Sequence, residues 1–530
     1  MRALTLLIAL AATSALAEPA VSPRGQAWWH DIAVLADDNM EGRLTGTPGY
    51  QRAADYVIQR FRAEGLAPAG EHGGYIQTIA FQEQVVDQHA STAALVAADG
   101  TAAPLAVGDA LILSPAGAPR PASVDAPLVF IGYGLHLPAQ GHDDLKGLDL
   151  RGKIAVFISG GPAALAGPVK AANRNARAEF LAAAGAVGMI TLNTPKQIEI
   201  PWARQKLLAS QTGMYLADPA LREMPDGFVS GSIDPAQAER LFAGSGHSFD
   251  EMAALADASQ PVPTFALPLR LRATIAAQRR AVTAPNVIAK LEGSDPTLRS
   301  EYVALSAHLD HVGVGEAIDG DRIYNGAMDD ASGVASVLDI AHRLKAGPRP
   351  KRSILFVIVA AEEKGLLGSH YYALRPTVPK GSIVADLNFD MPLPLWPLTT
   401  VLAQGDAESS LGAAARTVAA QNGLSLIADP LPNRNSFVRT DQFSFVKAGI
   451  PALAFKFGFA PGTDAFRIEH DWRATHYHAP SDDVNQPGVL KDEAIKLDDY
   501  VAALARTVAD TPARPVWLSG SVFNPANKAP

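Results

Sequence analysis

Residues 353–360 read SILFVIVA and run directly into Ala361, Glu362 and Glu363. A nearly continuous apolar run of this length is typical of a strand that is buried on both faces of a parallel sheet. The sequence predicts two further strands and two helices, at residues 302–307 and 382–389 and at about residues 331–345 and 408–422. We therefore expect an α/β fold in which helices flank a mixed, mostly parallel central sheet.

Each of the three predicted strands ends next to a side chain that can bind a metal ion. His308 follows the first strand, Glu363 the second and Asp390 the third. Sites in open α/β sheets form at the carboxyl ends of the strands, so adjacent parallel strands would bring these side chains to one rim. A helix cap or a solvated loop could explain one such residue, but three at equivalent places are harder to explain in that way.

Further carboxylates complete the predicted site. Asp329 directly precedes a predicted helix of small residues, and we expect it to bridge two metal ions. The structural alternative is that Asp329 and Asp330 only cap that helix. Glu362 and Glu363 should point in different directions at a strand end. We assign Glu363 as a ligand and Glu362 as the general base, which would take a proton from a metal-activated bridging water and deliver it to the leaving amine.

The remaining ligand is a histidine. His470, His476 and His478 are all candidates, and we favour His478 because Pro480 fixes its loop and Asp482 could support its ring. Two imidazoles and three carboxylates suit two Zn²⁺ ions, since zinc takes nitrogen and oxygen ligands in low coordination numbers.

Asp310 lies one residue beyond His308. A zinc-bound histidine normally donates its other ring N–H to an acceptor that is often a carboxylate. We assign Asp310 this supporting role in catalysis. A direct metal bond and simple surface exposure are the alternatives.

The chain has 530 residues, which exceeds what one core usually holds, so two or more domains are expected. The predicted divisions are residues 18–97 and 266–514 for the main α/β domain, 98–265 for an inserted module of short strands, and 515–530 for a loosely attached tail rich in Pro, Ser and Asn. Residues 40–47 should form a glycine-punctuated turn supported by Arg43. The inserted module carries no strong set of catalytic residues and is expected to shape a cleft or bind a partner.

The N-terminus is typical of a secretory signal peptide covering residues 1–17. Arg2 supplies positive charge, residues 4–16 form an apolar run too short to span a bilayer, and cleavage is expected before Glu18. An uncleaved anchor is the alternative that this length disfavours. The protein is thus expected to be exported, to a periplasm or the medium, without a membrane span. Its net charge of −9 argues against nucleic acid as a partner, and the absence of cysteine excludes disulfides.

These segments resemble the co-catalytic zinc aminopeptidases of metallopeptidase family twenty-eight, a group that includes glutamate carboxypeptidase II. The matching motifs are His308-x-Asp310, residues 325–333, Glu362-Glu363, Asp390-Met391 and Tyr477-His478-x-Pro480-x-Asp482. The resemblance implies a zinc exopeptidase-like fold, with one zinc ion on His308 and Asp390, a second on Glu363 and His478, and Asp329 shared by both. It thereby selects His478 among the candidate histidines. It also implies a cis peptide bond between Asp329 and Asp330.

By the same resemblance, the chain is expected to be an exported aminopeptidase that acts on peptides, and residues 125–192 look like a protease-associated domain. A carboxypeptidase or dipeptidase would be favoured if basic residues such as Arg434 and Arg439 lined the substrate pocket. The intact ligand set disfavours a binding protein that has lost catalysis. Because that set contains five ligands, it also disfavours a glutaminyl cyclase, which usually uses one metal ion. Residues 440–442 and the prolines at 392 and 394 depart from the family pattern where substrate pockets would lie, which affects specificity and not the metal ligands.

Overall fold

The computed structural model describes residues 20–198, 200–209, 211–434 and 436–527. The predicted signal peptide, residues 1–17, lies outside this part of the chain. Across the described ranges, none of the helices combines the length and the apolar character that crossing a bilayer would require.

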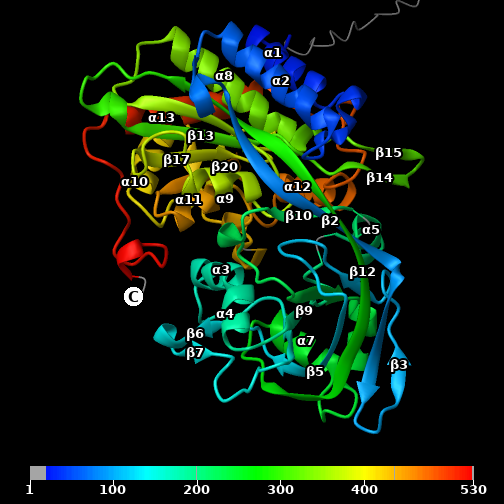
Figure 1. The fold of residues 1–530 in the computed structure, drawn as a ribbon. Helices are drawn as coiled ribbons and strands as arrows, with labels where there is room; N and C mark the ends of the chain where they lie inside the picture. Colours follow the sequence, from blue (N-terminus) through cyan, green and yellow to red (C-terminus); the bar gives the residue numbers. More distant parts are fainter. Residues whose placement is uncertain (1–19, 199, 210, 435, 528–530) are drawn as a thin grey trace, which may run out of the picture.

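A parallel group of strands forms the centre of the main sheet (Figure 1). β13 (Tyr302–His308) lies between β16 (Ser353–Val359) and β17 (Ile383–Phe389), and β20 (Ala452–Phe457) follows β17, with all four strands parallel. Every residue of β13, β16 and β17 is buried, as their apolar runs predict. Antiparallel strands flank the group: β12 (Thr264–Leu291) pairs with β16, and β18 (Thr400–Gln404) pairs with β20. The predicted mixed, mostly parallel sheet is therefore confirmed.

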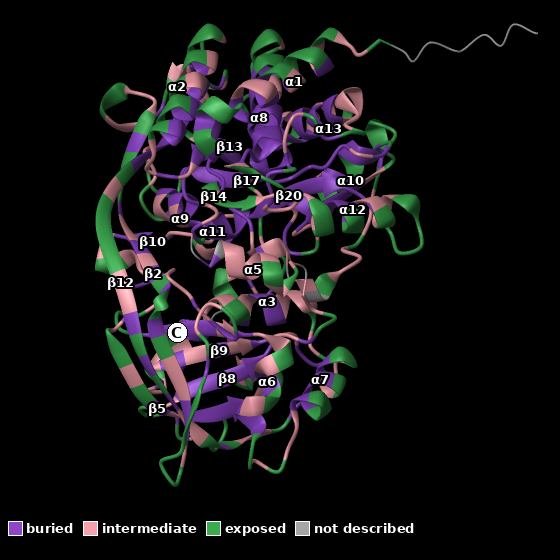
Figure 2. Cartoon of the chain, turned by 90° about the vertical axis from the view of Figure 1, so that its right-hand side faces the viewer, coloured by how far each residue is buried: buried purple, intermediate pink, exposed green. Residues whose placement is uncertain are grey.

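Helices cover both faces of this sheet, and the residues between the layers are buried (Figure 2). One face carries α1 (Pro23–Leu35), α2 (Pro48–Ala63), α8 (Ser332–Ala346), α10 (Leu411–Gln421) and α13 (Lys491–Asp510). The other carries α9 (Leu367–Leu374) and α11 (Gln442–Lys447). The helices predicted near residues 331–345 and 408–422 are α8 and α10. The outer position of α2 agrees with its apolar stripe, in which Ala53, Val57 and Phe61 recur at helical spacing and are fully buried.

Two long antiparallel strands, β2 (Ile76–Ala97) and β12, connect the main domain to the inserted module. In the module, β12 pairs with β5 (Ser123–Ile131), which begins a parallel series with β8 (Ile154–Ile158), β9 (Gly188–Leu192) and β11 (Val229–Ile233). A separate hydrophobic core fills the module and includes side chains of both long strands, from Val86 to Ile275. The core of the module thus includes side chains before residue 98 and after residue 265, the limits expected from the sequence.

The remaining elements of the module surround this series. Its helices are α3 (Gly167–Asn175), α4 (Arg177–Ala183), α5 (Trp202–Leu208), α6 (Pro235–Phe242) and α7 (Phe249–Asp257). Its further strands are β3 (Ala102–Pro104), β4 (Leu111–Leu113), β6 (His136–Leu137), β7 (His142–Asp143) and β10 (Gly213–Leu216). The main domain adds α12 (Asp464–Thr475), the short strands β1 (Ala67–Pro68) and β19 (Ser425–Leu426), and the hairpin of β14 (Gly313–Ile318) and β15 (Asp321–Tyr324).

The C-terminal segment packs more firmly than its composition predicts. Phe523 is 4% exposed, and its ring centroid lies 5.4 Å from that of Phe437 and 5.7 Å from that of Phe443. The indole of Trp517 donates to the backbone carbonyl of Gly449 at 3.0 Å. The expectation of a loosely attached tail is therefore wrong for residues 515–527, because two aromatic side chains anchor the segment to the main domain.

Candidate metal centre

The ends of the central strands bring three of the predicted residues together. His308 ends β13, Glu363 follows β16 and Asp390 follows β17. His308, Asp329 and Asp390 form one group, called here the His308 cluster, in which one potential ligand atom of each residue lies within 4.8 Å of the others. Nε2 of His308 is 3.2 Å from Oδ1 of Asp329, and the His308 side chain is 1% exposed. The parallel order of the strands thus produces the rim that the sequence predicts.

A second group contains a histidine that the sequence reasoning missed. His311, Asp329 and Glu363, called here the His311 cluster, also have potential ligand atoms within 4.8 Å of one another. Nδ1 of His311 lies 2.8 Å from Oε1 of Glu363, and the His311 side chain is fully buried. Its position directly after the predicted pair His308 and Asp310 was the available signal. Asp329 belongs to both clusters, the arrangement expected of a bridging carboxylate.

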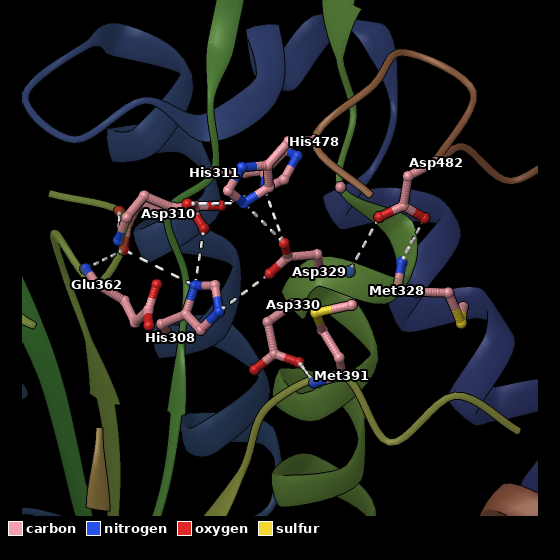
Figure 3. A network of polar contacts seen from close by, with 12 residues as sticks. His308, Asp310, His311, Met328, Asp329, Asp330, Glu362, Met391, His478 and Asp482 are labelled. Carbon is pink, nitrogen blue, oxygen red and sulfur yellow. Dashed lines mark hydrogen bonds and ion pairs between the residues drawn. The ribbon is translucent and has the colours of Figure 1, made fainter. Parts of the chain in front are cut away.

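His478 reaches the same place from the loop after α12. Its Nε2 atom lies 3.0 Å from Oε2 of Glu363. The same atom lies 3.3 Å from Oδ2 of Asp329 (Figure 3). Burial disfavours a charge on the ring, but these two carboxylates outweigh it and raise the pKa of His478 to about 9. The other candidate histidines lie differently: His470 is exposed, and His476 bonds through Nδ1 to the hydroxyl of Thr475.

Asp482 supports the Asp329 loop and not the His478 ring, contrary to our expectation. Its carboxylate accepts the backbone N–H groups of Met328 at 2.9 Å and Asp329 at 3.0 Å. Main-chain N–H groups in a buried loop need acceptors, and the two carboxylate oxygens satisfy consecutive ones. The peptide bond between Asp329 and Asp330 is cis, as the family resemblance implies. Asp330 accepts the N–H groups of Gly333 and Met391, each at 3.0 Å, so it does act as a helix cap.

Asp310 also contacts different atoms from those expected. Its carboxylate lies 4.0 Å from Nδ1 of His308, beyond hydrogen-bond distance, and instead accepts the backbone N–H groups of Glu362 at 3.0 Å and Glu363 at 3.3 Å. His308 Nδ1 donates to the backbone carbonyl of Asp310 at 3.0 Å. That bond places the proton on Nδ1 and leaves Nε2 facing Asp329, while the Asp310 carboxylate fixes the backbone of the glutamate pair.

Arg43 joins the loops behind the two clusters. Its fully buried guanidinium donates to the backbone carbonyls of Leu309 at 2.8 Å, Leu35 at 2.7 Å, Asn325 at 2.6 Å and Gly326 at 2.9 Å. Burial lowers the pKa of Arg43 to about 10. The turn at residues 40–47 therefore has the structural role that we expected, and it holds the loops that carry His308 and Asp329.

We predict that Arg43→Met lowers the free energy of unfolding by at least about 3 kcal/mol, because it leaves several buried carbonyls without a donor at about 1–3 kcal/mol each. Urea unfolding of both proteins would measure the difference. Arg62→Met, a change at an exposed arginine of α2, serves as the control and should cost less than about 0.5 kcal/mol. Equal stability of the two variants would show that the guanidinium bonds contribute little.

The carboxylates of the centre differ in their tendency to ionise. Burial raises the pKa of Glu362, and the neighbouring charges of Asp390 and Asp441 add to this effect. Burial would raise the pKa of Glu363 as well, but the neighbouring His478 and His311 outweigh this effect and lower that pKa. Two adjacent glutamates thus have pKa values shifted in opposite directions, a separation common where one carboxylate carries charge and the other exchanges protons.

The donor set fits a divalent metal ion. Nδ1 and Nε2 of His311, Oδ2 of Asp329 and Oε1 of Glu363 are buried and make no well-aligned hydrogen bond among the described residues, although Nδ1 of His311 and Oε1 of Glu363 lie only 2.8 Å apart. Buried polar atoms are normally satisfied, so a group of potential ligand atoms that face one another without aligned hydrogen bonds fits a bound cation. Imidazole nitrogens together with carboxylate oxygens are ligands that zinc accepts.

An open cleft of about 500 Å³ lies against both clusters. Its lining comprises Asp329, Glu362, Asp390, Met391, Arg434, Ser436, Arg439, Thr440, Lys456, Arg473, Tyr477 and His478. Glu362 therefore faces the same space as potential ligands of both clusters. The region around residues 440–442, where the sequence departs from the family pattern, contributes Thr440 to this wall.

Comparison with known proteins gives a family match over part of the chain and a fold match over most of it. Residues 286–505 match the model of peptidase family M28. The chain is 30% identical over 239 residues to probable leucine aminopeptidase 2 of Aspergillus fumigatus, covering 42% of this chain and 44% of that protein. It is 37% identical over 111 residues to leupeptin-inactivating enzyme 1 of Streptomyces exfoliatus, covering 21% of this chain and 23% of that protein. The matches thus span less than half the length of these curated relatives.

The structure of an aminopeptidase from Aneurinibacillus sp. strain AM-1 superposes with a TM-score of 0.53 at 20% identity, covering 92% of this chain and 95% of that one. At this identity the likeness shows a shared fold, which includes the inserted module because nearly the whole chain is covered. The family match is more local, but residues 286–505 carry every predicted metal ligand. These residues, about two fifths of the chain, are thus similar to peptidase family M28.

Proposed function

We propose that this protein is an exported, zinc-dependent aminopeptidase that removes N-terminal residues from peptides. The observation that carries the proposal is the pair of buried clusters that share Asp329 beside an open cleft containing Glu362. The match of residues 286–505 to peptidase family M28 and the similarity to a probable leucine aminopeptidase support the reaction class. Arg434 and Arg439 line the cleft, so the alternative of a carboxypeptidase or dipeptidase also has the basic residues that it requires.

Two zinc ions would be held by the two clusters. His308 and Asp390 would bind one ion, Glu363 and His478 the other, and Asp329 both. His311 adds a ligand at the second site, because its Nδ1 atom faces Glu363 and Asp329. When bound, zinc would polarise the scissile carbonyl and activate a water molecule for attack.

Glu362 would move the protons of the reaction. It lines the cleft, and the bond from its backbone N–H to Asp310 fixes the start of the turn that carries it. Its carboxylate would take a proton from the attacking water and then give it to the nitrogen of the leaving amine. A carboxyl whose pKa is raised by burial suits both steps, because proton transfer is efficient when that pKa lies near the working pH.

Metal removal tests this proposal directly. We expect purified protein to hydrolyse leucine p-nitroanilide, to lose that activity when zinc is removed by a chelator, and to regain it when zinc is added back. The measurement is the initial rate of nitroaniline release before chelation, after it and after addition of zinc. A rate that the chelator does not change would rule out the metallopeptidase proposal.

Export rests on residues 1–17 and has its own test. Signal-peptide cleavage before Glu18 would release the mature chain to a periplasm or the medium. N-terminal sequencing of protein recovered from those fractions should then begin at Glu18, whereas a chain that remains in the cytoplasm and still begins at Met1 would contradict export.

A further inference from the structure

We propose that the cleft beside the metal centre recognises a carboxylate on the peptide substrate, an inference that rests on the proposed peptidase function and names its substrate class. Four cationic side chains line this cleft: Arg434, Arg439, Lys456 and Arg473. They come from separate segments of the main domain and meet on the wall that also includes Tyr477. A neutral apolar substrate would make no use of so many positive charges in one small space.

Two of the arginines are held in place by a buried carboxylate. Glu469 on α12 is 3% exposed in its side chain, and its Oε1 atom accepts from Nη1 of Arg434 at 2.8 Å and from Nε of Arg473 at 2.6 Å. The Arg473 guanidinium also lies over the Tyr477 ring, 5.0 Å from its centroid. One carboxylate therefore orients two guanidinium groups that line the cleft. Groups oriented in advance lose less entropy when they bind a ligand.

Lys456 adds charge at the edge of the metal centre. It projects from β20, and its Nζ atom lies 3.6 Å from Oδ1 of Asp390. Since Asp390 is a proposed zinc ligand, its negative charge would be shared with the ion and would offset the lysine less. Lys456 thus contributes to a positive potential where a substrate would lie.

A second cavity of about 410 Å³ adjoins the cleft and shares three of its cations, Arg434, Lys456 and Arg473. Its walls are largely apolar, with Leu393, Trp396, Phe457 and Phe459 among them. Asp429 and Glu469 are the acidic side chains of its lining. Leaving aside the residues of the proposed metal centre, the two cavities are lined by four cationic and two acidic side chains among the described residues.

The inserted module supports the two segments that carry these arginines. Arg204 of α5 donates to the backbone carbonyls of Arg473 and Ala474, each at 3.2 Å. Asn175 of α3 donates to the backbone carbonyl of Val438 at 3.1 Å, four residues after Arg434. The module therefore touches the cationic wall from outside and helps to fix its position.

These observations favour a carboxylate because a guanidinium binds it with two parallel hydrogen bonds, and charge-assisted bonds are about twice as strong as neutral ones. An apolar side chain would displace water from the cations without replacing its hydrogen bonds. The carboxylate could belong to an acidic side chain next to the scissile bond or to the C-terminus of a short peptide. Both sources present the same chemistry to the cleft.

Two matched substrate pairs distinguish the sources. Glutamate and glutamine p-nitroanilides differ only in a side-chain carboxylate, and Leu-Leu and Leu-Leu-amide differ only in a terminal one. For the zinc-loaded protein we expect kcat/KM to be at least about tenfold higher for the carboxylate member of one pair, the effect of one charge-assisted hydrogen bond. A preference for glutamate over glutamine p-nitroanilide would show that the cleft recognises a side-chain carboxylate. A preference for Leu-Leu over Leu-Leu-amide would show that it recognises the C-terminal carboxylate.

Arginine variants connect that preference to the cleft. Arg473→Gln and Arg434→Gln should each reduce the preference about tenfold, whereas Arg467→Gln, at an arginine on the same helix α12 with a side chain 64% exposed, should leave it unchanged. Thermal melting of all three variants identifies any that is unfolded, and a folded variant of either arginine is sufficient for the test. A preference retained in both folded arginine variants would overturn the inference.

The substrate inference and the proposed function fail in different ways. Chelator-sensitive hydrolysis of leucine p-nitroanilide without a preference in either pair would overturn carboxylate recognition and leave the aminopeptidase proposal standing. An absence of hydrolysis for all substrates with zinc present would overturn both.

Discussion

Glu362→Gln should lower kcat about 10²- to 10⁴-fold while the zinc content stays at its wild-type value. Glutamine keeps the size of the side chain but can neither accept the proton of the attacking water nor give it to the leaving amine. Because the proposed ligands are unchanged, the effect should fall on the chemical step. The measurements are kcat for leucine p-nitroanilide and zinc per chain by elemental analysis.

The same substitution at an exposed glutamate controls for general effects. Glu292→Gln alters a side chain outside the cleft and should change neither kcat nor zinc content. If Glu362→Gln turned over substrate at the wild-type rate, the assignment of the general base would be wrong. If it instead lost zinc, Glu362 would belong to the metal ligands and Glu363 alone would not explain the second site.

Asp329→Ala should reduce kcat/KM more than about 10³-fold and lower the bound zinc at both sites. Asp329 belongs to both clusters, so its removal takes one ligand from each proposed ion. The metal ions are expected to supply several kcal/mol of transition-state stabilisation, and each 1.36 kcal/mol is tenfold in rate. Zinc titration by calorimetry, together with initial rates at saturating zinc, would measure both effects.

Asp55→Ala, at an exposed aspartate on α2, is the matched control and should keep both zinc sites and full activity. Loss of only one ion in Asp329→Ala would mean that Asp329 is a terminal ligand of one site. Two fully occupied sites of unchanged affinity would remove Asp329 from the metal centre altogether.

The strand-end argument predicted the fold and most of the site because it depends on short-range patterns. Apolar runs that end in His308, Glu363 and Asp390 identify both the strands and the rim on which these residues meet. His311 was missed because a residue just beyond a strand end can point in any direction, and only the turn that follows Asp310 directs its ring toward Glu363. A ligand-type residue next to a predicted ligand was the one signal in the sequence.

The predicted supporting contacts were less accurate because buried loops have their own hydrogen-bonding needs. Asp310 and Asp482 were expected to hold histidine rings, but both accept pairs of backbone N–H groups from the segments that carry the ligands. Sequence proximity to a histidine does not reveal which donors a folded loop will present. The anchoring of the C-terminal segment by Trp517 and Phe523 likewise depends on a surface that forms only after folding.

An anomalous difference map at the zinc absorption edge, from crystals of zinc-loaded protein, tests the dinuclear centre most directly. The proposal predicts two peaks, one within bonding distance of His308 and Asp390 and the other within bonding distance of Glu363, His311 and His478, with Asp329 between them. Zinc–nitrogen and zinc–oxygen distances should be about 2.0–2.2 Å. A single peak, or no peak at these clusters in active protein, would contradict a two-zinc centre.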